Sequence, residues 1–76
     1  MEETLGARIK KLRIKKEISG KYMQEKLGFA IYKSYWMIEK DMVKVDHEQL
    51  IKIAETLNVD MNTLLKGIKN ATKKPN

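Results

Sequence analysis

The sequence contains no cysteine, a single histidine and no long apolar run. Without cysteine, a disulfide framework, thiolate catalysis and cysteine-type zinc sites are all excluded, and a reducing compartment is the simplest setting. No apolar segment approaches the roughly 18 residues that a membrane-spanning helix needs. We therefore expect a cytoplasmic protein that does not enter a membrane.

Residues that commonly support catalysis are also scarce. His47 has no cysteine partner and no HExxH spacing, and no glycine-rich phosphate loop is present. The carboxylates Glu39, Asp41, Asp46 and Glu48 fall at expected helix ends, where capping accounts for them. We predict no enzyme activity, no catalytic residue, no metal site, no cofactor and no small-molecule ligand, and we expect His47 at the surface.

The charge of the chain is unevenly distributed. The 76 residues suffice for one domain with a single shared core, and their formal net charge is +6. Residues 1–40 hold ten Lys/Arg and five acids, residues 41–65 hold two and five, and residues 66–76 hold four and none. A basic half is typical of a protein that binds a polyanion, most often nucleic acid. Composition alone leaves a second interpretation open, in which the lysines only keep the surface soluble.

Capping residues divide the chain into five short helical segments. A residue that can cap a helix precedes four apolar patterns with helical spacing: Thr4, Ser19, Asp46 and Asp60. Residues that can end helices follow three of them: Gly28, Asn58 and Gly67. The second helix is expected over residues 20–27 and the third within residues 28–41. Residues 1–67 are predicted to form the domain, and residues 68–76 a flexible basic tail.

No segment alternates apolar and polar residues with the period of a strand, so the sequence predicts an all-α fold, a compact five-helix bundle. Short helices are stable only through mutual burial of their apolar faces. The expected core consists of Leu5, Ile9, Leu12, Ile18, Met23, Leu27, Tyr35, Ile38, Leu50, Ile53, Leu57, Val59 and Leu64.

The stretch GFAIYKSYWMIEKD, residues 28–41, holds more large apolar residues than one side of a short helix can bury. A helical wheel with about 100° per residue places Ile31, Tyr35 and Ile38 on one face. The opposite arc holds Tyr32, Lys33, Trp36, Met37 and Lys40. We interpret the first set as core and the second as an outward contact surface, because an exposed tryptophan beside a methionine is costly without a partner.

Four stretches occur in an order and at spacings that resemble one family: LGARIKKLRIKKEIS, KYMQEKLGF, IEKD and DHEQLIKIAETLNVDMNTLL. Together they cover residues 5–65 and are similar to the helix-turn-helix domain of the Cro and phage-repressor (XRE) type, a lambda-repressor-like fold. The resemblance implies that the second helix lies over the DNA backbone, that the third enters the major groove, and that the domain binds as a two-fold dimer. It also implies a location in the bacterial cytosol or in a phage-infected host.

Some positions match the family and others depart from it. Arg13 and Glu39 stand where the family often has an ion pair joining the first helix to the third, so the resemblance implies a structural role for both. The family favours a glutamine at the position of Gly20, a small residue at Gln24 and a glycine at Asp41.

The turn between the second and third helices is one residue longer than usual, within residues 29–31, when positions are counted back from the expected ion pair. If the extra residue precedes Ile31, the resemblance implies a base-contacting set of Tyr32, Lys33, Ser34 and Met37. The expected DNA-backbone contacts are Ser19, Gly20, Lys21, Trp36, Lys40 and Lys44, with the amides of residues 20–22 facing a phosphate. A lysine can reach guanine O6 and N7, and a serine can bond to a base or a phosphate.

Each of these residues has a plainer alternative. Lys33 and Ser34 could simply be solvated, and Tyr32 and Met37 could lie on thymine methyl groups or shield the edge of the core. Three roles are open for Trp36: a sugar-phosphate contact, an anchor for a dimer or another partner, and a half-buried core residue.

The sequence therefore predicts a sequence-specific DNA-binding regulator, a phage or mobile-element type repressor that occupies an operator. We expect a homodimer formed through the fifth helix and the segment from Leu65 to Ile68. The alternative is a protein-interaction module, an antirepressor or adaptor, that docks through Trp36 and Met37. A basic membrane-binding first helix is less favoured, because repeated caps and short helices indicate a folded bundle.

Overall fold

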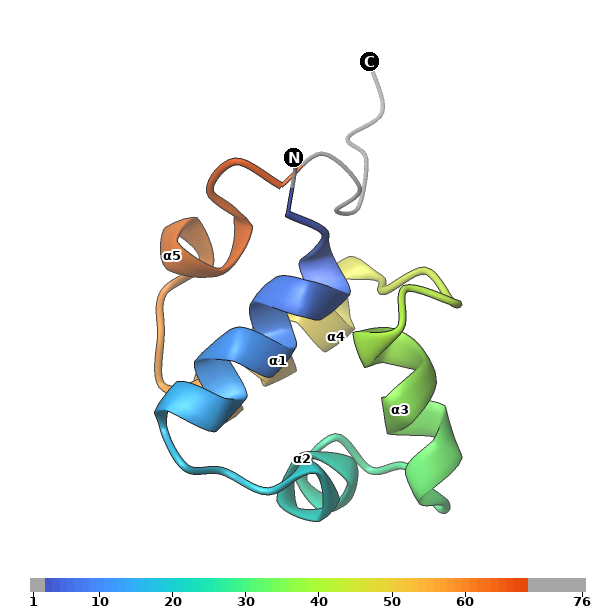
Figure 1. Cartoon of the computed structure of the whole chain (residues 1–76). Helices are drawn as coiled ribbons and strands as arrows, with labels where there is room; N and C mark the ends of the chain where they lie inside the picture. The colour runs from blue at the N-terminus through green and yellow to red at the C-terminus, as the bar shows by residue number, and fades with distance from the viewer. Residues whose placement is uncertain (1–2, 69–76) are drawn as a thin grey trace.

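A computed structural model of the chain describes residues 3–68 and contains five α-helices in that range. They are α1 (Leu5–Lys15), α2 (Gly20–Lys26), α3 (Tyr32–Glu39), α4 (His47–Leu57) and α5 (Met61–Leu65). Helix α1 runs across the front with α4 behind it, α2 lies below and α3 stands to one side (Figure 1). Because residues 3–68 hold helices and no strand, the all-α prediction is confirmed. Within these residues, none of the helices has the length and apolar character needed to cross a membrane.

Side-chain caps begin four of the helices. The four oxygens that accept a backbone N–H belong to Thr4 (3.2 Å), Ser19 (3.0 Å), Asp46 (2.8 Å) and Asp60 (2.7 Å). The pKa of Asp60 lies below its ordinary value because its carboxylate accepts hydrogen bonds from Thr63. Helix α3 differs, because its N-cap is Ile31, which offers no side-chain hydrogen bond.

Left-handed residues follow three of the helices, at the positions that the sequence predicts. Gly28 (φ 81°) follows α2, and Asn58 (φ 57°) ends α4. Gly67 (φ 76°) lies two residues after α5, and a positive φ is costly for most other residues. Ile68, where the predicted basic tail begins, still packs against the core, and the rest of that tail lies outside the described residues.

The core lies between the five helices: α1 packs against α3, α4 and α5, and α2 packs against α3 and α4. Its buried apolar residues are Leu5, Ile9, Met23, Leu27, Tyr35, Ile38, Val45, Leu50, Ile53, Ala54, Leu57 and Leu64. Three residues of the expected core, Leu12, Ile18 and Val59, pack against this cluster but are only partly buried. The helical wheel is wrong for Ile31, which is 59% exposed. Its backbone is extended, with φ −131° and ψ 153°, so helical periodicity does not apply to it.

Helix α1 approaches the end of α3 very closely at Gly6. A Cβ atom at this position would lie 2.5 Å from the carbonyl oxygens of Ile38 and Glu39, so a larger residue would push the helices apart. The Gly6 amide donates to Asp41 Oδ1 at 2.8 Å. Asp41 has a left-handed φ of 59°, which Asp tolerates better than most residues. This side chain therefore ties the first turn of α1 to the end of α3.

Candidate nucleic-acid interface

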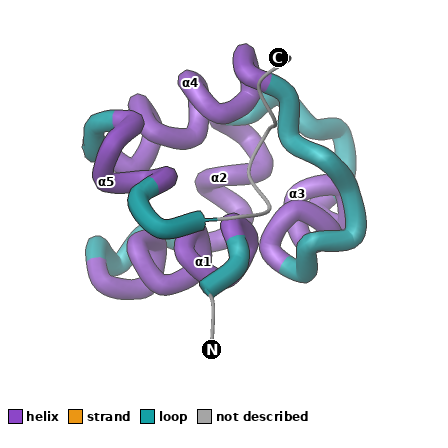
Figure 2. The backbone as a smooth tube through the Cα atoms, turned by 90° about the horizontal axis from the view of Figure 1, so that it is seen from above, coloured by secondary structure: helices purple, strands orange, loops and turns teal. Residues whose placement is uncertain are grey.

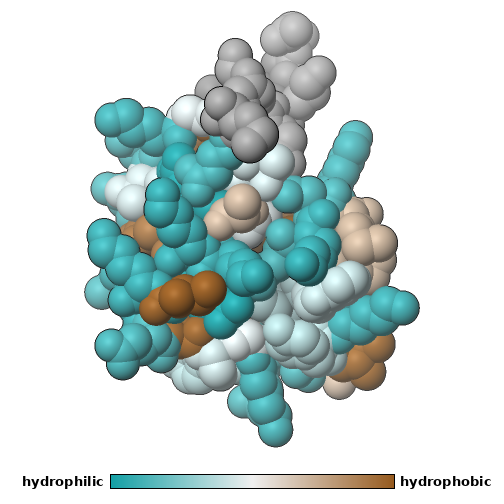
Figure 3. All heavy atoms as spheres, viewed as in Figure 1, coloured by the Kyte–Doolittle hydropathy of each residue, from teal (hydrophilic) through white to brown (hydrophobic). Residues whose placement is uncertain are grey.

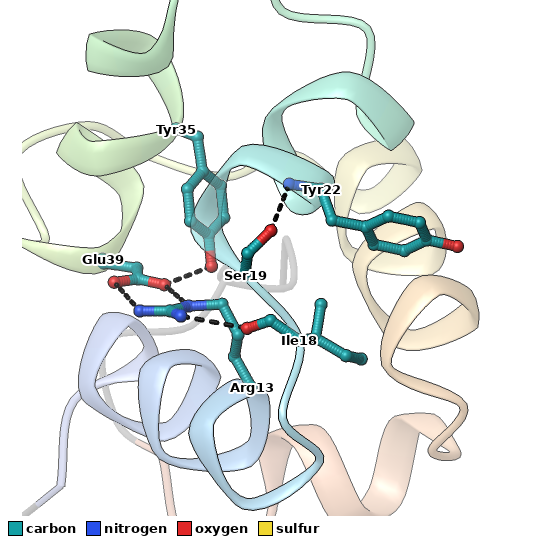
Figure 4. A network of polar contacts seen from close by, with 6 residues as sticks. All are labelled: Arg13, Ile18, Ser19, Tyr22, Tyr35 and Glu39. Atoms are coloured by element: carbon teal, nitrogen blue, oxygen red, sulfur yellow. Dashed lines mark hydrogen bonds and ion pairs between the residues drawn. The ribbon is translucent and has the colours of Figure 1, made fainter.

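A buried polar cluster, hereafter the joint, fixes α3 against α1. It consists of Arg13, Tyr35, Glu39 and the carbonyl of Ile18 (Figure 4). Arg13 Nε donates to Glu39 Oε2 at 2.6 Å and Nη2 donates to Oε1 at 3.3 Å, while Nη1 donates to the Ile18 carbonyl at 3.0 Å. The Tyr35 hydroxyl donates to the same Oε2 atom of Glu39. The two residues expected to form an ion pair thus share a larger network.

Most of the joint is buried, which holds its side chains in place. The Glu39 carboxylate is almost completely enclosed, with a side-chain exposure of 5%, against 14% for Arg13. Burial, and then the hydrogen bond to Glu39, raise the pKa of the Tyr35 hydroxyl above its ordinary range. The hydrogen bond to Glu39 also raises the pKa of Arg13. Residues 3–68 contain no buried side-chain nitrogen or oxygen atom without a hydrogen-bond partner, so no part of the joint is left unsatisfied.

The turn between α2 and α3 is closed by Gln24. Its side-chain Nε2 atom donates to the Phe29 carbonyl at 3.1 Å, and its backbone carbonyl accepts from the Phe29 amide at 3.0 Å. Phe29 packs its ring against the core. The sequence marks Gln24 only as a departure from the family pattern. In the structure, this side chain holds the turn together.

Helix α3 begins at Tyr32, which is the register that puts the predicted base-contacting residues on its first two turns. Tyr32 is 43% exposed and Trp36 is 37% exposed, and Lys33 also lies at the surface. Ser34 and Met37 are half-buried, so Met37 projects less than the helical wheel suggests. Tyr35, one residue before Trp36, is completely buried. One face of α3 is thus fixed inside the domain, and the other is open to solvent.

Helices α2 and α3 pack directly on one another and are joined by a short turn. A family model described as a helix-turn-helix domain matches residues 6–69. The chain belongs to the helix-turn-helix domain family. No curated protein significantly matches the sequence. In helix-turn-helix domains, the second helix of the motif enters the major groove of DNA while the first crosses the backbone. In this chain, α2 and α3 are the first and second helices of the motif.

The start of α2 holds three of the predicted DNA-backbone contacts: Ser19, Gly20 and Lys21. Ser19 Oγ accepts the Tyr22 amide at 3.0 Å, so this amide, one of those expected to face a phosphate, already has a partner. The Ser19 side chain is exposed, as is that of Lys21. Gly20, at the first position of α2, lies against the ring of Tyr32 from α3. The first residues of the two helices of the motif are therefore in contact.

Exposed lysines lie on α3, on α2 and in the segment that follows α3. Lys40 Nζ lies 5.7 Å from the centre of the Trp36 ring, within the range of a cation–π interaction. The other predicted contacts with long basic side chains, Lys21, Lys33 and Lys44, are all exposed. Long hydrophilic side chains cover most of the face seen in Figure 3, and apolar atoms appear there only in small separate areas. His47 is exposed, and the described part of the chain has no cluster of side chains arranged to hold a metal ion.

The structure explains two of the departures from the family pattern, Asp41 and Gly20. Asp41 replaces a family glycine, accepts a left-handed φ and supplies a carboxylate to α1. Gly20 replaces a family glutamine and leaves space for Tyr32. Both were visible in the sequence as mismatches to the family pattern, but neither partner could be named without the spatial arrangement.

Proposed function

We propose that the chain is a sequence-specific DNA-binding transcriptional regulator, a repressor of phage or mobile-element type that occupies an operator. The observation that carries this proposal is the open face of α3, where Tyr32, Lys33 and Trp36 are exposed while Tyr35 and Glu39 fix the opposite face. A recognition helix must be held rigidly if its side chains are to meet base edges in a defined register.

In this proposal the contacts divide into positioning and reading. Lys33 and Ser34 read base edges from the first turn of α3, with Met37 one turn further along. Lys21, Lys40 and Lys44 bind phosphates, and Ser19 adds a hydroxyl at the start of α2. Phosphate contacts set the orientation of the protein on the duplex but carry no sequence information directly, so recognition depends on the few residues of α3. Repression would follow from steric competition with the polymerase in the cytoplasm.

We further propose that two copies bind together, because a single short recognition helix reads too few base pairs to select a site in a genome. Helices α5 and α3 lie on opposite sides of the molecule in both views (Figure 2). A dimer formed through α5 would therefore leave α3 uncovered. Met61, Leu65 and Ile68 are only half-buried and supply apolar surface there.

Arg8 stiffens this region from within the same chain. Its Nη1 atom donates to the Thr63 carbonyl at 2.8 Å, and its Nη2 atom donates to the Lys66 carbonyl at 2.9 Å. Arg8 Nε also pairs with Glu3 at 2.8 Å. These contacts favour a fixed orientation of α5, as a two-fold interface requires.

The test is selection from a pool of random-sequence duplexes at two salt concentrations, followed by sequencing of the bound fraction. We expect a near-palindromic site to be enriched, with affinity falling about 10³-fold or more between low and moderate salt. Salt-sensitive binding without an enriched site would contradict sequence-specific regulation.

A second candidate function is a protein-interaction module, an antirepressor or adaptor. The exposure of Trp36 and of Ile31 beside the start of α3 favours it. Absence of any DNA binding in the selection would make this candidate the better account.

A further inference from the structure

Gly20 and Tyr32 occupy one another's space. A Cβ atom at position 20 would lie 2.6 Å from the Tyr32 hydroxyl oxygen and 2.8 Å from Cε1 of its ring. Real Cβ atoms do not approach other heavy atoms so closely, so Tyr32 fills the volume that a side chain at position 20 would need. Gly20 has no positive φ, so this position favours glycine because of space and not because of backbone conformation.

The Tyr32 ring is held from two sides. Its centre lies 6.3 Å from that of Tyr35, with the rings tilted by 58°. Tyr35 is completely buried and bonded to Glu39, so it is a fixed support. On its other side, the Tyr32 ring contacts Gly20. The ring therefore runs from α3 toward the start of α2, and 43% of the residue stays exposed. The Tyr32 hydroxyl therefore lies beside the first turn of α2 and does not project outward from α3.

We infer that Tyr32 binds a DNA phosphate through its hydroxyl and does not read a base. This inference rests on the proposed function, in which α2 lies over the DNA backbone, and it changes the role that the sequence predicts for Tyr32. Tyrosine hydroxyls are common donors to phosphate oxygens. This inference also explains Gly20, because the absence of a side chain there leaves the space in which the Tyr32 ring reaches α2, the helix proposed to lie over the DNA backbone.

The direct test compares Tyr32→Phe with the wild-type chain on the selected site and on unrelated duplex. Loss of one hydrogen bond should weaken binding about 3- to 10-fold, and by the same factor on both duplexes. The preferred sequence in a repeated selection should not change. Tyr22→Phe is the matched control, because Tyr22 is an exposed tyrosine on α2 whose side chain has no role in this inference, and it should bind as the wild type does.

A second variant tests the role of Gly20. Gly20→Ala should displace the Tyr32 ring and lower affinity by a factor similar to that of Tyr32→Phe. In a Tyr32→Ala background, where no ring is present, the same Gly20→Ala change should have no further effect, so the two positions should be strongly non-additive. Thermal unfolding of each variant separates loss of binding from loss of folding.

Four possible results distinguish a failure of the proposed function from a failure of this inference. If the wild type selects no site, the proposed function fails and the inference fails with it. If the wild type selects a site but Tyr32→Phe binds it normally, only the inference is wrong. A changed base preference in Tyr32→Phe, or additive effects of Gly20→Ala and Tyr32→Ala, would also overturn it.

Discussion

The two faces of α3 contain similar residues in opposite situations. Tyr35 and Trp36 are neighbours in the chain, yet the first has no exposed surface and the second is 37% exposed. Glu39 and Lys40 are also neighbours. The carboxylate lies in the joint with Arg13, whereas the ammonium lies over the Trp36 ring at the surface.

The difference shows how one short helix serves both folding and recognition. On the inner face, every buried side-chain nitrogen and oxygen atom has a hydrogen-bond partner, and loss of that partner would leave an uncompensated buried group. On the outer face, water already satisfies the polar atoms, so substitutions there should affect binding much more than stability. The predictions below test this division, beginning with the largest expected effect.

The largest effect is expected for Tyr35→Ala. Removal of this buried ring leaves a cavity, and removal of its hydroxyl takes a donor from Glu39, so we expect a loss of about 3 to 5 kcal/mol in the free energy of unfolding. Urea unfolding followed by circular dichroism measures it. Trp36→Ala is the control on the outer face and should cost much less. Equal losses for the two variants would remove the distinction between the faces.

On the outer face, Lys33→Ala should lower affinity for the selected site by about 1 to 3 kcal/mol, since a lysine that bonds to guanine discriminates among bases. Unrelated duplex should be bound almost as well as by the wild type. Competition binding on the two duplexes measures the ratio. A similar loss on both would mean that Lys33 contacts only phosphate.

Alkaline pH should weaken the inner face. Because the pKa of Tyr35 is raised above its ordinary value of 10.0, the unfolded chain loses this proton above that pH while the folded chain keeps it. The free energy of unfolding should therefore fall by up to about 1.4 kcal/mol per pH unit above pH 10. Tyr35→Phe has no such proton and should lack this contribution. Urea unfolding at a series of pH values compares the two chains, and identical slopes would contradict the prediction.

The smallest effect concerns Lys40, whose ammonium lies over Trp36. Lys40→Ala should weaken binding to all duplexes alike, because a phosphate contact carries no sequence information. The slope of log affinity against log salt should fall by about 1. Lys52→Ala, an exposed lysine on α4, is the control and should leave the slope unchanged. Loss of sequence preference in Lys40→Ala would assign this residue to base reading instead.

Some of this architecture can be predicted from local rules of sequence. The N-caps Thr4, Ser19, Asp46 and Asp60 all bond as their residue types suggest, because capping depends only on the next three residues. The helical wheel wrongly places Ile31 in the core, because the start of α3 depends on the turn before it. That turn is closed by Gln24 and Phe29, whose pairing has no periodic pattern.

Contacts between distant parts of the chain could not be predicted from the residues alone. The bond from Gly6 to Asp41 joins positions 35 residues apart, and nothing in the local sequence of either indicates the other. The contact between Gly20 and Tyr32 is similar. Considered alone, Gly20 is only a mismatch to the family pattern and Tyr32 only a surface aromatic. Their packing against each other explains both.

The most direct test of the account is an NMR titration of the isotope-labelled chain with a duplex carrying the selected site. We predict that the largest amide shifts will fall in α3 from Tyr32 to Met37 and at Ser19 to Lys21, with the α4 amides nearly unchanged. Shifts concentrated on α4 or α5, or no shifts at stoichiometric DNA, would contradict the claim that the open face of α3 recognises DNA.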